Sequence, residues 1–172
     1  SFHKVHHSAT TLNPFTVFRT HPFEAVLFST RSALVQGIVT ALFFFFFGDK
    51  VTLIMVLGAS IFTFVFNLMG SNLRHSPVSI SYWDMLECII MSPAQHHIHH
   101  SKAKKHIDKN FGVVLSIWDW IFGSLYLSKE EEQLQFGLSK EQSKEHHSLK
   151  GLYIDPINES GKELFRFLSH QF

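Results

Sequence analysis

The chain has 172 residues, a length that suits a single domain. Its 15 lysines and arginines nearly balance 14 aspartates and glutamates, so nucleic acid is not an expected partner. The sequence is unusually rich in histidine (13) and phenylalanine (19), and only 17% of its residues are charged, which favours a membrane protein. A single cysteine, Cys88, excludes an intrachain disulfide framework and CxxC zinc chemistry.

The first predicted element is a short helix that carries a histidine box. The box His3-Lys4-Val5-His6-His7 has the spacing H-x-x-H-H, which places three of its rings on one helical face. Asn13-Pro14 is expected to end this helix. Because the chain begins at Ser1 rather than at a methionine and the box follows almost at once, we expect that an upstream segment is missing. No signal peptide is visible.

Two apolar runs follow and predict a membrane-spanning hairpin over residues 33–47 and 51–69. A spanning helix needs about 20 apolar residues, which the second run provides and the first reaches only by extending back toward Arg31. Phe43 to Phe47 are apolar all round, which suits lipid better than the surface of a soluble protein. A buried hairpin in a soluble protein is the alternative. Before the runs, Pro22 suits a helix start, and His21 is expected beside the ligands or at the membrane interface.

The hairpin has a consequence for topology. Its short connection, Gly48-Asp49-Lys50, returns the chain to the side that it left, so both ends of the hairpin lie on one side of the bilayer. Only Lys50 is basic in the connection, whereas seven basic residues flank the spans on the other side, and the positive-inside rule makes that side cytoplasmic. These residues are Lys4, Arg19, Arg31, Arg74, Lys102, Lys104 and Lys105.

A second histidine box follows the hairpin and repeats the spacing of the first. In His96-His97-Ile98-His99-His100, three rings share a helical face, and that of His97 points about 100° away. His75, just after the second run, is also expected to reach the site that the two boxes form. Neutral imidazole binds zinc, iron, copper and nickel, so the boxes predict one or two metal ions. A cluster of surface histidines is the other interpretation.

The segments around the second box are predicted from their patterns. Tyr82 to Met91 is typical of an amphipathic helix on the membrane surface, and Pro93 restarts the chain into the box. Asp119 lies in the apolar run 113–127 and needs a partner there. It either orients a ligand imidazole or forms a local cap or ion pair, and Asp108 has the first option too. His146 and His147 lie in a charged stretch and are not expected to bind metal.

The two boxes resemble those of the fatty acid hydroxylase/sterol desaturase superfamily. The similarity continues through HKVHHSATTLNPFTVFRTHPFE and HIDKNFGVVLSIWDWIFGSLY, and so covers most of residues 1–127. The tail, FGLSKEQ…LKGLYIDP, is similar to bacterial sterol-desaturase-like members. The combination is specific for the superfamily but weak for any one substrate.

The resemblance implies a membrane-bound non-haem di-iron oxygenase that uses O2 to hydroxylate or desaturate a lipid, whether a fatty acyl chain, a sterol or an ether lipid. The superfamily also has an upstream H-x3-H-type pair, which this sequence lacks, so the site is incomplete or the chain truncated. No flavin or NAD fingerprint is present, and a cytochrome b-type protein or a ferredoxin with its reductase is the implied electron donor. By motif, the two irons would be bound by His3, His6, His7, His75, His96, His99 and His100.

These observations predict an all-α integral membrane helical bundle with a transmembrane hairpin and a cytoplasmic, histidine-rich metal-binding cap. Residues 1–127 form the hydroxylase-like domain and residues 128–172 a charged cytoplasmic tail. The expected location is the bacterial inner membrane or the endoplasmic reticulum. Two rivals stay open. A zinc enzyme would need a general-base glutamate, which neither box contains, and a non-enzymatic metal-binding membrane protein would need no oxidative chemistry.

Overall fold

The computed structural model describes residues 2–128, 132–138 and 148–169, and it is mostly helical, as predicted. Over these residues the β structure is limited to two isolated bridges, Ile90–Leu115 and Ser101–Phe136. The chain divides into two compact units. Pro22–Gly70 form one, and Ser1–His21 together with Ser71–Phe172 form the other.

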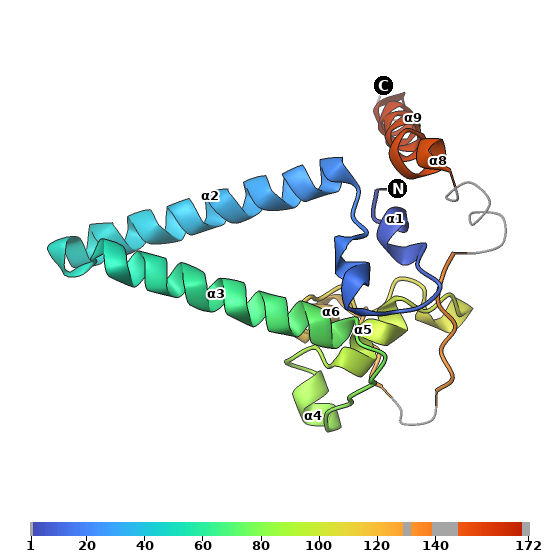
Figure 1. Cartoon of the computed structure of the whole chain (residues 1–172), viewed down its shortest axis with the longest axis horizontal. Helices are drawn as coiled ribbons and strands as arrows, with labels where there is room; N and C mark the ends of the chain where they lie inside the picture. The colour runs from blue at the N-terminus through green and yellow to red at the C-terminus, as the bar shows by residue number, and fades with distance from the viewer. Residues whose placement is uncertain (1, 129–131, 139–147, 170–172) are drawn as a thin grey trace. The chain divides into compact units, whose positions relative to one another are not determined.

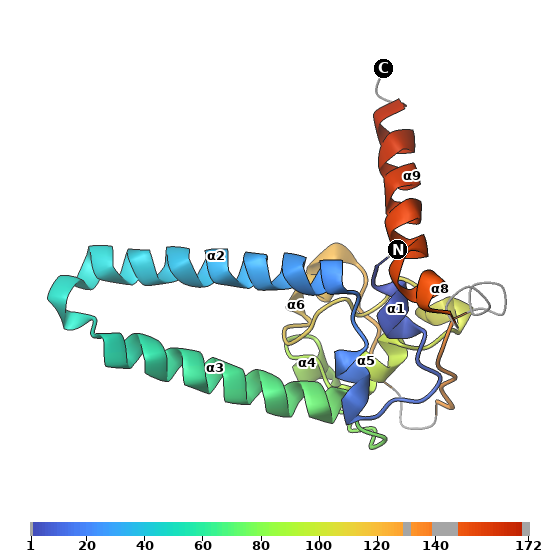
Figure 2. The ribbon, with the colours of Figure 1, turned by 45° about the horizontal axis from the view of Figure 1, so that its top comes forward.

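The first unit is a helical hairpin (Figures 1 and 2). Helix α2 (Pro22–Phe47) and the 3₁₀ turn η2 (Gly48–Lys50) lead into α3 (Leu53–Arg74). Both helices are long and apolar enough to cross a membrane, and nearly all their side chains are exposed. As expected, α2 begins at Pro22. The helix starts well before residue 33, where the apolar run begins, and so includes the segment with Glu24 and Arg31.

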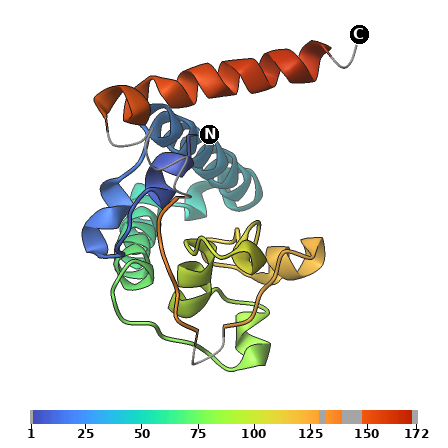
Figure 3. The same ribbon diagram turned by 90° about the vertical axis from the view of Figure 1, so that its right-hand side faces the viewer.

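The second unit, which we call the cap, has a small apolar core and many buried polar groups. It contains α1 (Lys4–His7), η1 (Pro14–Phe18), α4 (Asp84–Glu87), α5 (Pro93–His99), η3 (Lys104–His106) and α6 (Ile117–Phe122) (Figure 3). Its apolar core residues are Val5, Leu12, Met91, Ala94 and Ile98. Because so little apolar surface is buried, hydrogen bonds between side chains and backbone position most of these short elements.

Two local predictions are wrong in their extent. Helix α1 already ends at His7, and Asn13 instead starts η1, where its side chain accepts a hydrogen bond from the Phe15 amide at 2.9 Å. Of the predicted amphipathic helix 82–91, only α4 is helical. The following residues pair with a distant segment instead, since the Met91 amide donates to the Val114 carbonyl at 2.9 Å and the Ser116 amide to the Ile89 carbonyl at 3.0 Å.

Two helices near the C-terminus were not predicted. Helix α8 (Leu149–Tyr153) is followed by α9 (Asp155–Ser169). Figure 3 shows the N-terminal segment beside the start of α9, and the ammonium group of Lys4 lies 3.0 Å from the Glu159 carboxylate. The tail therefore contains a defined helix that contacts the first histidine box.

Candidate metal centre

The second histidine box lies on α5, whose start is fixed by a capping box. The Ser92 hydroxyl accepts from the Gln95 amide at 3.1 Å, the Gln95 side chain accepts from the Ser92 amide at 3.0 Å, and Pro93 occupies the first turn. These contacts satisfy amides that would otherwise be unpaired at a buried helix end. The helix then brings His96 and His99 to its last turn and His100 to its C-cap.

The first box lies on α1, with His3 as its N-cap. The Arg19 guanidinium holds the end of this short helix by donating to the Val5 carbonyl at 3.1 Å and the Ser8 hydroxyl at 2.8 Å. A single helical turn is not stable alone, so such contacts are needed to keep its histidines in place.

The seven histidines named in the sequence come together in two adjacent groups. His6, His75, His96 and His100 form a buried group of four, which we call the inner group. His3, His7 and His99 form a more exposed group of three, which we call the outer group, and the ligand atoms within each group lie within 4.8 Å of one another. The ring centroids of His7 and His100 are only 4.5 Å apart, so the two groups adjoin.

The Nε2 atoms within each group are in close contact. In the inner group, the Nε2 of His75 lies 3.0 Å from that of His6 and 3.2 Å from that of His96, and the Nε2 atoms of His96 and His100 are 3.1 Å apart. In the outer group the Nε2 atoms of His7 and His99 are 3.1 Å apart. Two imidazole nitrogens bound at about 2.1 Å to one ion are about 3.0–3.4 Å apart at angles between 90° and tetrahedral. The spacing therefore fits shared metal ions.

Backbone carbonyls fix the tautomers of two of these rings. The Nδ1 of His75 lies 2.8 Å from the Ser71 carbonyl oxygen, and the Nδ1 of His99 lies 2.9 Å from that of Lys109. A carbonyl only accepts hydrogen bonds, so each Nδ1 carries the proton and the Nε2 of the neutral ring keeps its lone pair. Both lone pairs are then available to a metal ion in the centre.

Burial keeps the rings of the centre neutral. It lowers the pKa of His6 to about 3, with the neighbouring His75 adding to the effect, and it lowers the pKa of His7 to about 2, with His99 adding to it. Burial also holds the pKa of His96 and of His100 well below the ordinary value, with other histidines of the cluster as the second cause. A neutral imidazole is the form that binds metal, so these histidines suit a cation site.

Neither of the two candidate carboxylates, Asp119 and Asp108, forms a described hydrogen bond to a histidine of the centre. Asp119 accepts from the amides of Phe111 and Gly112, each at 2.8 Å, and from the Ser124 hydroxyl at 2.5 Å. Of the two roles left open for Asp119, these contacts match the local cap. Asp108 is exposed with a left-handed φ of 58°, and no hydrogen bond from it to a histidine is found within the described residues.

The remaining histidines lie outside both groups. His21 is buried with its Nε2 3.0 Å from the Tyr153 carbonyl oxygen, and His97 is buried with its ring 6.1 Å from that of Phe136. His106, which drew no attention in the sequence, has its Nε2 3.2 Å from a Glu132 carboxylate oxygen. His146 and His147 lie outside the described residues.

Three fully buried polar residues that support α5 were missed in the sequence. Glu87 accepts from the Ser92 hydroxyl at 2.6 Å, and Gln95 donates to the Glu87 carbonyl at 3.1 Å. Asn110 donates to the carbonyls of Gln95 at 3.1 Å and Tyr126 at 2.9 Å. The S-x-x-Q pattern at Ser92 is a capping-box signal and marks Gln95, whereas nothing in the sequence marks the Lys109 carbonyl.

Comparison with known proteins agrees with this geometry. The fatty acid hydroxylase family model matches residues 1–124. The chain is 39% identical to human alkylglycerol monooxygenase over 74 residues, which is 43% of this chain and 16% of that protein. It is 28% identical to the Danio rerio alkylglycerol monooxygenase over 142 residues, 80% of this chain and 26% of that protein. No solved structure matches the chain.

The family match covers both boxes, His75 and the loop that supports His99. The stretch IDKNFG…IWDWIFGSL is itself similar to alkylglycerol monooxygenase, in keeping with the match to the human protein. The chain spans about a quarter or less of the length of the curated relatives that it matches. Since the family model matches most of the chain and all seven clustered histidines, the chain belongs to the fatty acid hydroxylase family.

Proposed function

We propose that the seven clustered histidines bind two iron ions and that the full protein oxidises a membrane lipid with O2. The observation that carries this proposal is the convergence of the seven rings into one group of four and one of three. Among the described residues neither group contains a carboxylate, and neither histidine box contains the glutamate that acts as general base in a zinc hydrolase. Family membership favours iron over zinc, which imidazole ligands alone do not distinguish.

Bound iron would supply the redox chemistry with O2 that cleaves an unactivated C–H bond, which no side chain achieves. The chain's own contribution is to hold the lone pairs of its imidazoles toward the centre. Ser71 does so through its carbonyl oxygen for His75, and Lys109 for His99. A ring fixed in this way cannot turn its protonated nitrogen toward the ion.

The two groups differ in access. All members of the inner group are buried, whereas in the outer group His3 is exposed and His7 and His99 are partly exposed. The aromatic ring of Phe111, itself 59% exposed, lies with its centroid 5.8 Å from that of His99. The outer group is therefore the side from which O2 and an apolar substrate would approach.

We place the two candidate spans, α2 and α3, across a bilayer with the cap on its cytoplasmic side. The membrane would be the bacterial inner membrane or the endoplasmic reticulum. The substrate is a fatty acyl, sterol or ether lipid, which is hydroxylated or desaturated. Electrons come from a separate redox protein, a cytochrome b-type protein or a ferredoxin with its reductase.

Metal analysis of the full-length protein tests this proposal. Purified without oxygen from iron-replete cells, it should contain about two irons per chain. His99→Ala should lower the iron content toward one ion by removing an outer-group ligand, and His96→Ala should do so through the inner group. Both variants should lose the O2-dependent lipid product. Stoichiometric zinc without iron, with activity that survives iron chelation, would refute the oxygenase.

A further inference from the structure

Helix α9 carries its apolar and charged side chains on opposite faces. At about 100° per residue, Ile157, Leu164 and Leu168 fall within about 40° of one another, and Phe165 and Phe167 flank them. All five are exposed, by between 46% and 73%. We call these five residues the apolar face of α9. Nothing described in the cap covers this face, so five large apolar side chains are left open on one helix.

The opposite face is attached to the rest of the cap. Glu159 accepts from the Lys4 ammonium group at 3.0 Å, and Pro156 is buried at the start of the helix. Just before it, the carbonyl oxygen of Tyr153 lies 3.0 Å from the Nε2 of His21. Glu159 is about 160° round the helix from the centre of the apolar face. These contacts therefore turn the apolar face away from α1.

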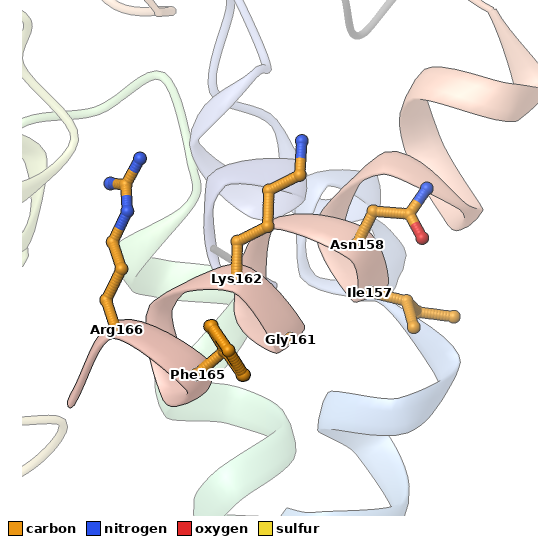
Figure 4. Close-up of a pocket in the computed structure, with 6 residues that line it drawn as sticks. All are labelled: Ile157, Asn158, Gly161, Lys162, Phe165 and Arg166. Carbon is orange, nitrogen blue, oxygen red and sulfur yellow. The ribbon is translucent and has the colours of Figure 1, made fainter. Parts of the chain in front are cut away.

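Two basic side chains lie on the charged side of the helix, Lys162 about 140° and Arg166 about 180° from the centre of the apolar face. Figure 4 shows Lys162 and Arg166 extending from the same side of the helix, with Phe165 and Ile157 lower down beside Gly161. Together with Asn158, these residues line an open groove along the helix. Long basic side chains can cover apolar surface with their stems while the charged ends reach phosphate groups. The helix therefore combines an apolar side, which fits the acyl chains of a bilayer, with long basic side chains that can reach phosphate groups at the level of the headgroups.

We propose that α9 lies in the headgroup region of the bilayer, with its apolar face toward the acyl chains and Lys162 and Arg166 on anionic headgroups. Large phenylalanine, leucine and isoleucine side chains on one face and charges on the other are typical of helices that lie in a membrane surface. A bilayer is favoured over a protein partner because α3 continues directly into the cap at Arg74, so a membrane is already within reach. This inference rests on the membrane placement in the proposed function.

The consequence is a second attachment of the metal centre to the membrane. Through Lys4 and Glu159, α9 contacts the helix that carries His6 and His7. The hairpin is the first attachment, since His75 directly follows α3 in the chain. With both attachments in place, the cap is held against the bilayer that contains the lipid substrate.

Spin labels on the whole protein in vesicles test this placement. In a Cys88→Ser background, single cysteines replace Leu164, on the apolar face of α9, and its neighbour Glu163, about 100° away on the charged side. Leu57 within α3 serves as a reference for the hairpin. Collisions of each nitroxide with O2, which concentrates in the bilayer, are compared with collisions with a water-soluble nickel chelate. We expect the Leu164→Cys label to meet O2 several-fold more often than nickel, and the Glu163→Cys label to show the reverse.

The possible outcomes separate this inference from the proposed function. If the Leu57→Cys label is in lipid but the Leu164→Cys label meets nickel freely, α9 is not on the membrane and only this inference fails. If the Leu57→Cys label also meets nickel, the spanning hairpin itself is wrong. A Leu164→Cys label that is shielded from both reagents would mean that protein covers the face, either a second copy or another segment, and would overturn the proposal.

The role of the basic pair has its own test. Adding anionic lipid to zwitterionic vesicles should move the Leu164→Cys label deeper, and Lys162→Glu with Arg166→Glu should abolish this shift. The matched control, Lys104→Glu, changes an exposed lysine elsewhere in the cap and should leave the shift in place. A label depth that is the same in both lipid compositions would refute headgroup binding by Lys162 and Arg166.

Discussion

The imidazoles of the centre are crowded together and those of the inner group are buried, so a proton added to one ring would be repelled by a proton on the next. This is why burial is the largest cause of the lowered pKa of His6 and why nearby histidines add to it. The same crowding brings several Nε2 atoms within 3.0–3.2 Å of one another. A cation between these nitrogens would relieve the contact between their lone pairs, so the metal-free cap should be the less stable form.

We therefore predict that the metal-free protein loses stability as the pH falls below about 6.5, the pKa of an unperturbed histidine. Above that pH the histidines are neutral in both states. Below it the unfolded chain takes up protons that folded His6, with a pKa of about 3, does not, so each such histidine lowers the free energy of unfolding by about 1.4 kcal/mol per pH unit. Denaturant midpoints in detergent between about pH 7.5 and pH 5.5 measure this slope.

His6→Gln provides the control for that prediction. It removes one of the shifted groups, so the slope should become shallower while remaining of the same sign. A stability that is independent of pH over this range would show that the histidines are not held neutral by the fold.

His97 faces away from the centre that its neighbours form. Its ring is 4% exposed and lies beside Phe136, and burial lowers its pKa, partly offset by hydrogen bonds with the backbone of Arg74 and Ser76. We predict that His97→Ala retains metal binding and lowers stability by about 1–3 kcal/mol, because it loses packing and buried hydrogen bonds. His96→Ala should lose metal from the inner group. Iron content and thermal unfolding of the two variants give the comparison, and loss of iron in His97→Ala alone would reverse the assignment.

Among the elements, the loop between the second box and α6 determines how His99 is held. Asn110, with a left-handed φ of 55°, is anchored by hydrogen bonds to Gln95 and Tyr126, and Asp119 binds the next two amides. The residue between Asp108 and Asn110 is Lys109, whose carbonyl oxygen accepts from His99. Asp119 therefore acts on the ligand through the loop backbone, as a positioning residue.

We predict that Asp119→Asn weakens metal binding at the outer group by about 10–100-fold and leaves the inner group almost unchanged. Asparagine keeps the size of the side chain, but its NH2 group would face one of the two backbone amides that donate hydrogen bonds to the carboxylate. Two donors would then face each other. Titration of metal into the metal-free protein, which resolves two classes of site, measures the effect. Asp84→Asn, an exposed aspartate in α4, is the matched control. An equal loss at both sites would show that Asp119 only supports the cap as a whole.

Local patterns in the sequence predict the helical elements and the histidine groups better than they predict the loops. The H-x-x-H-H spacing is enough to place His96, His99 and His100 on one face, since helix geometry alone decides it. The division of the histidines into inner and outer groups depends on how α1 docks against α5, which no local pattern contains. The role of Asp119 likewise follows from a fold in which the loop at Phe111 and Gly112 returns to α6.

In the C-terminal region, the charged composition concealed a periodic pattern. The stretch 155–169 has few apolar residues overall, yet most of them share one face. The predicted helix 82–91 failed for the opposite reason. Its pattern is amphipathic, but Ile89 and Met91 gain backbone partners in the segment around Leu115. Long-range pairing of this kind overrides a local preference for helix.

At the scale of the whole molecule, both histidine boxes belong to one unit. The chain leaves that unit at residue 22 to form the hairpin and returns to it after residue 70. The turn η2 at Lys50 lies at the far end of the hairpin (Figure 1). If α2 and α3 span the bilayer, the turn and the metal centre must be on opposite sides, whatever the angle between the two units. A soluble protein would instead have to leave the five consecutive phenylalanines of α2 in water, which is unfavourable.

We predict that Lys50→Cys and Lys102→Cys, each in a Cys88→Ser background, react with a membrane-impermeant maleimide from opposite sides of sealed vesicles. Both positions are exposed and neither is a candidate ligand, so labelling reports topology without disturbing the centre. In inside-out vesicles, which present the cytoplasmic face, position 102 should react at once and position 50 only after detergent opens the membrane. Reaction of both positions from the same side of intact vesicles would contradict the spanning hairpin, and with it the membrane placement of the metal centre.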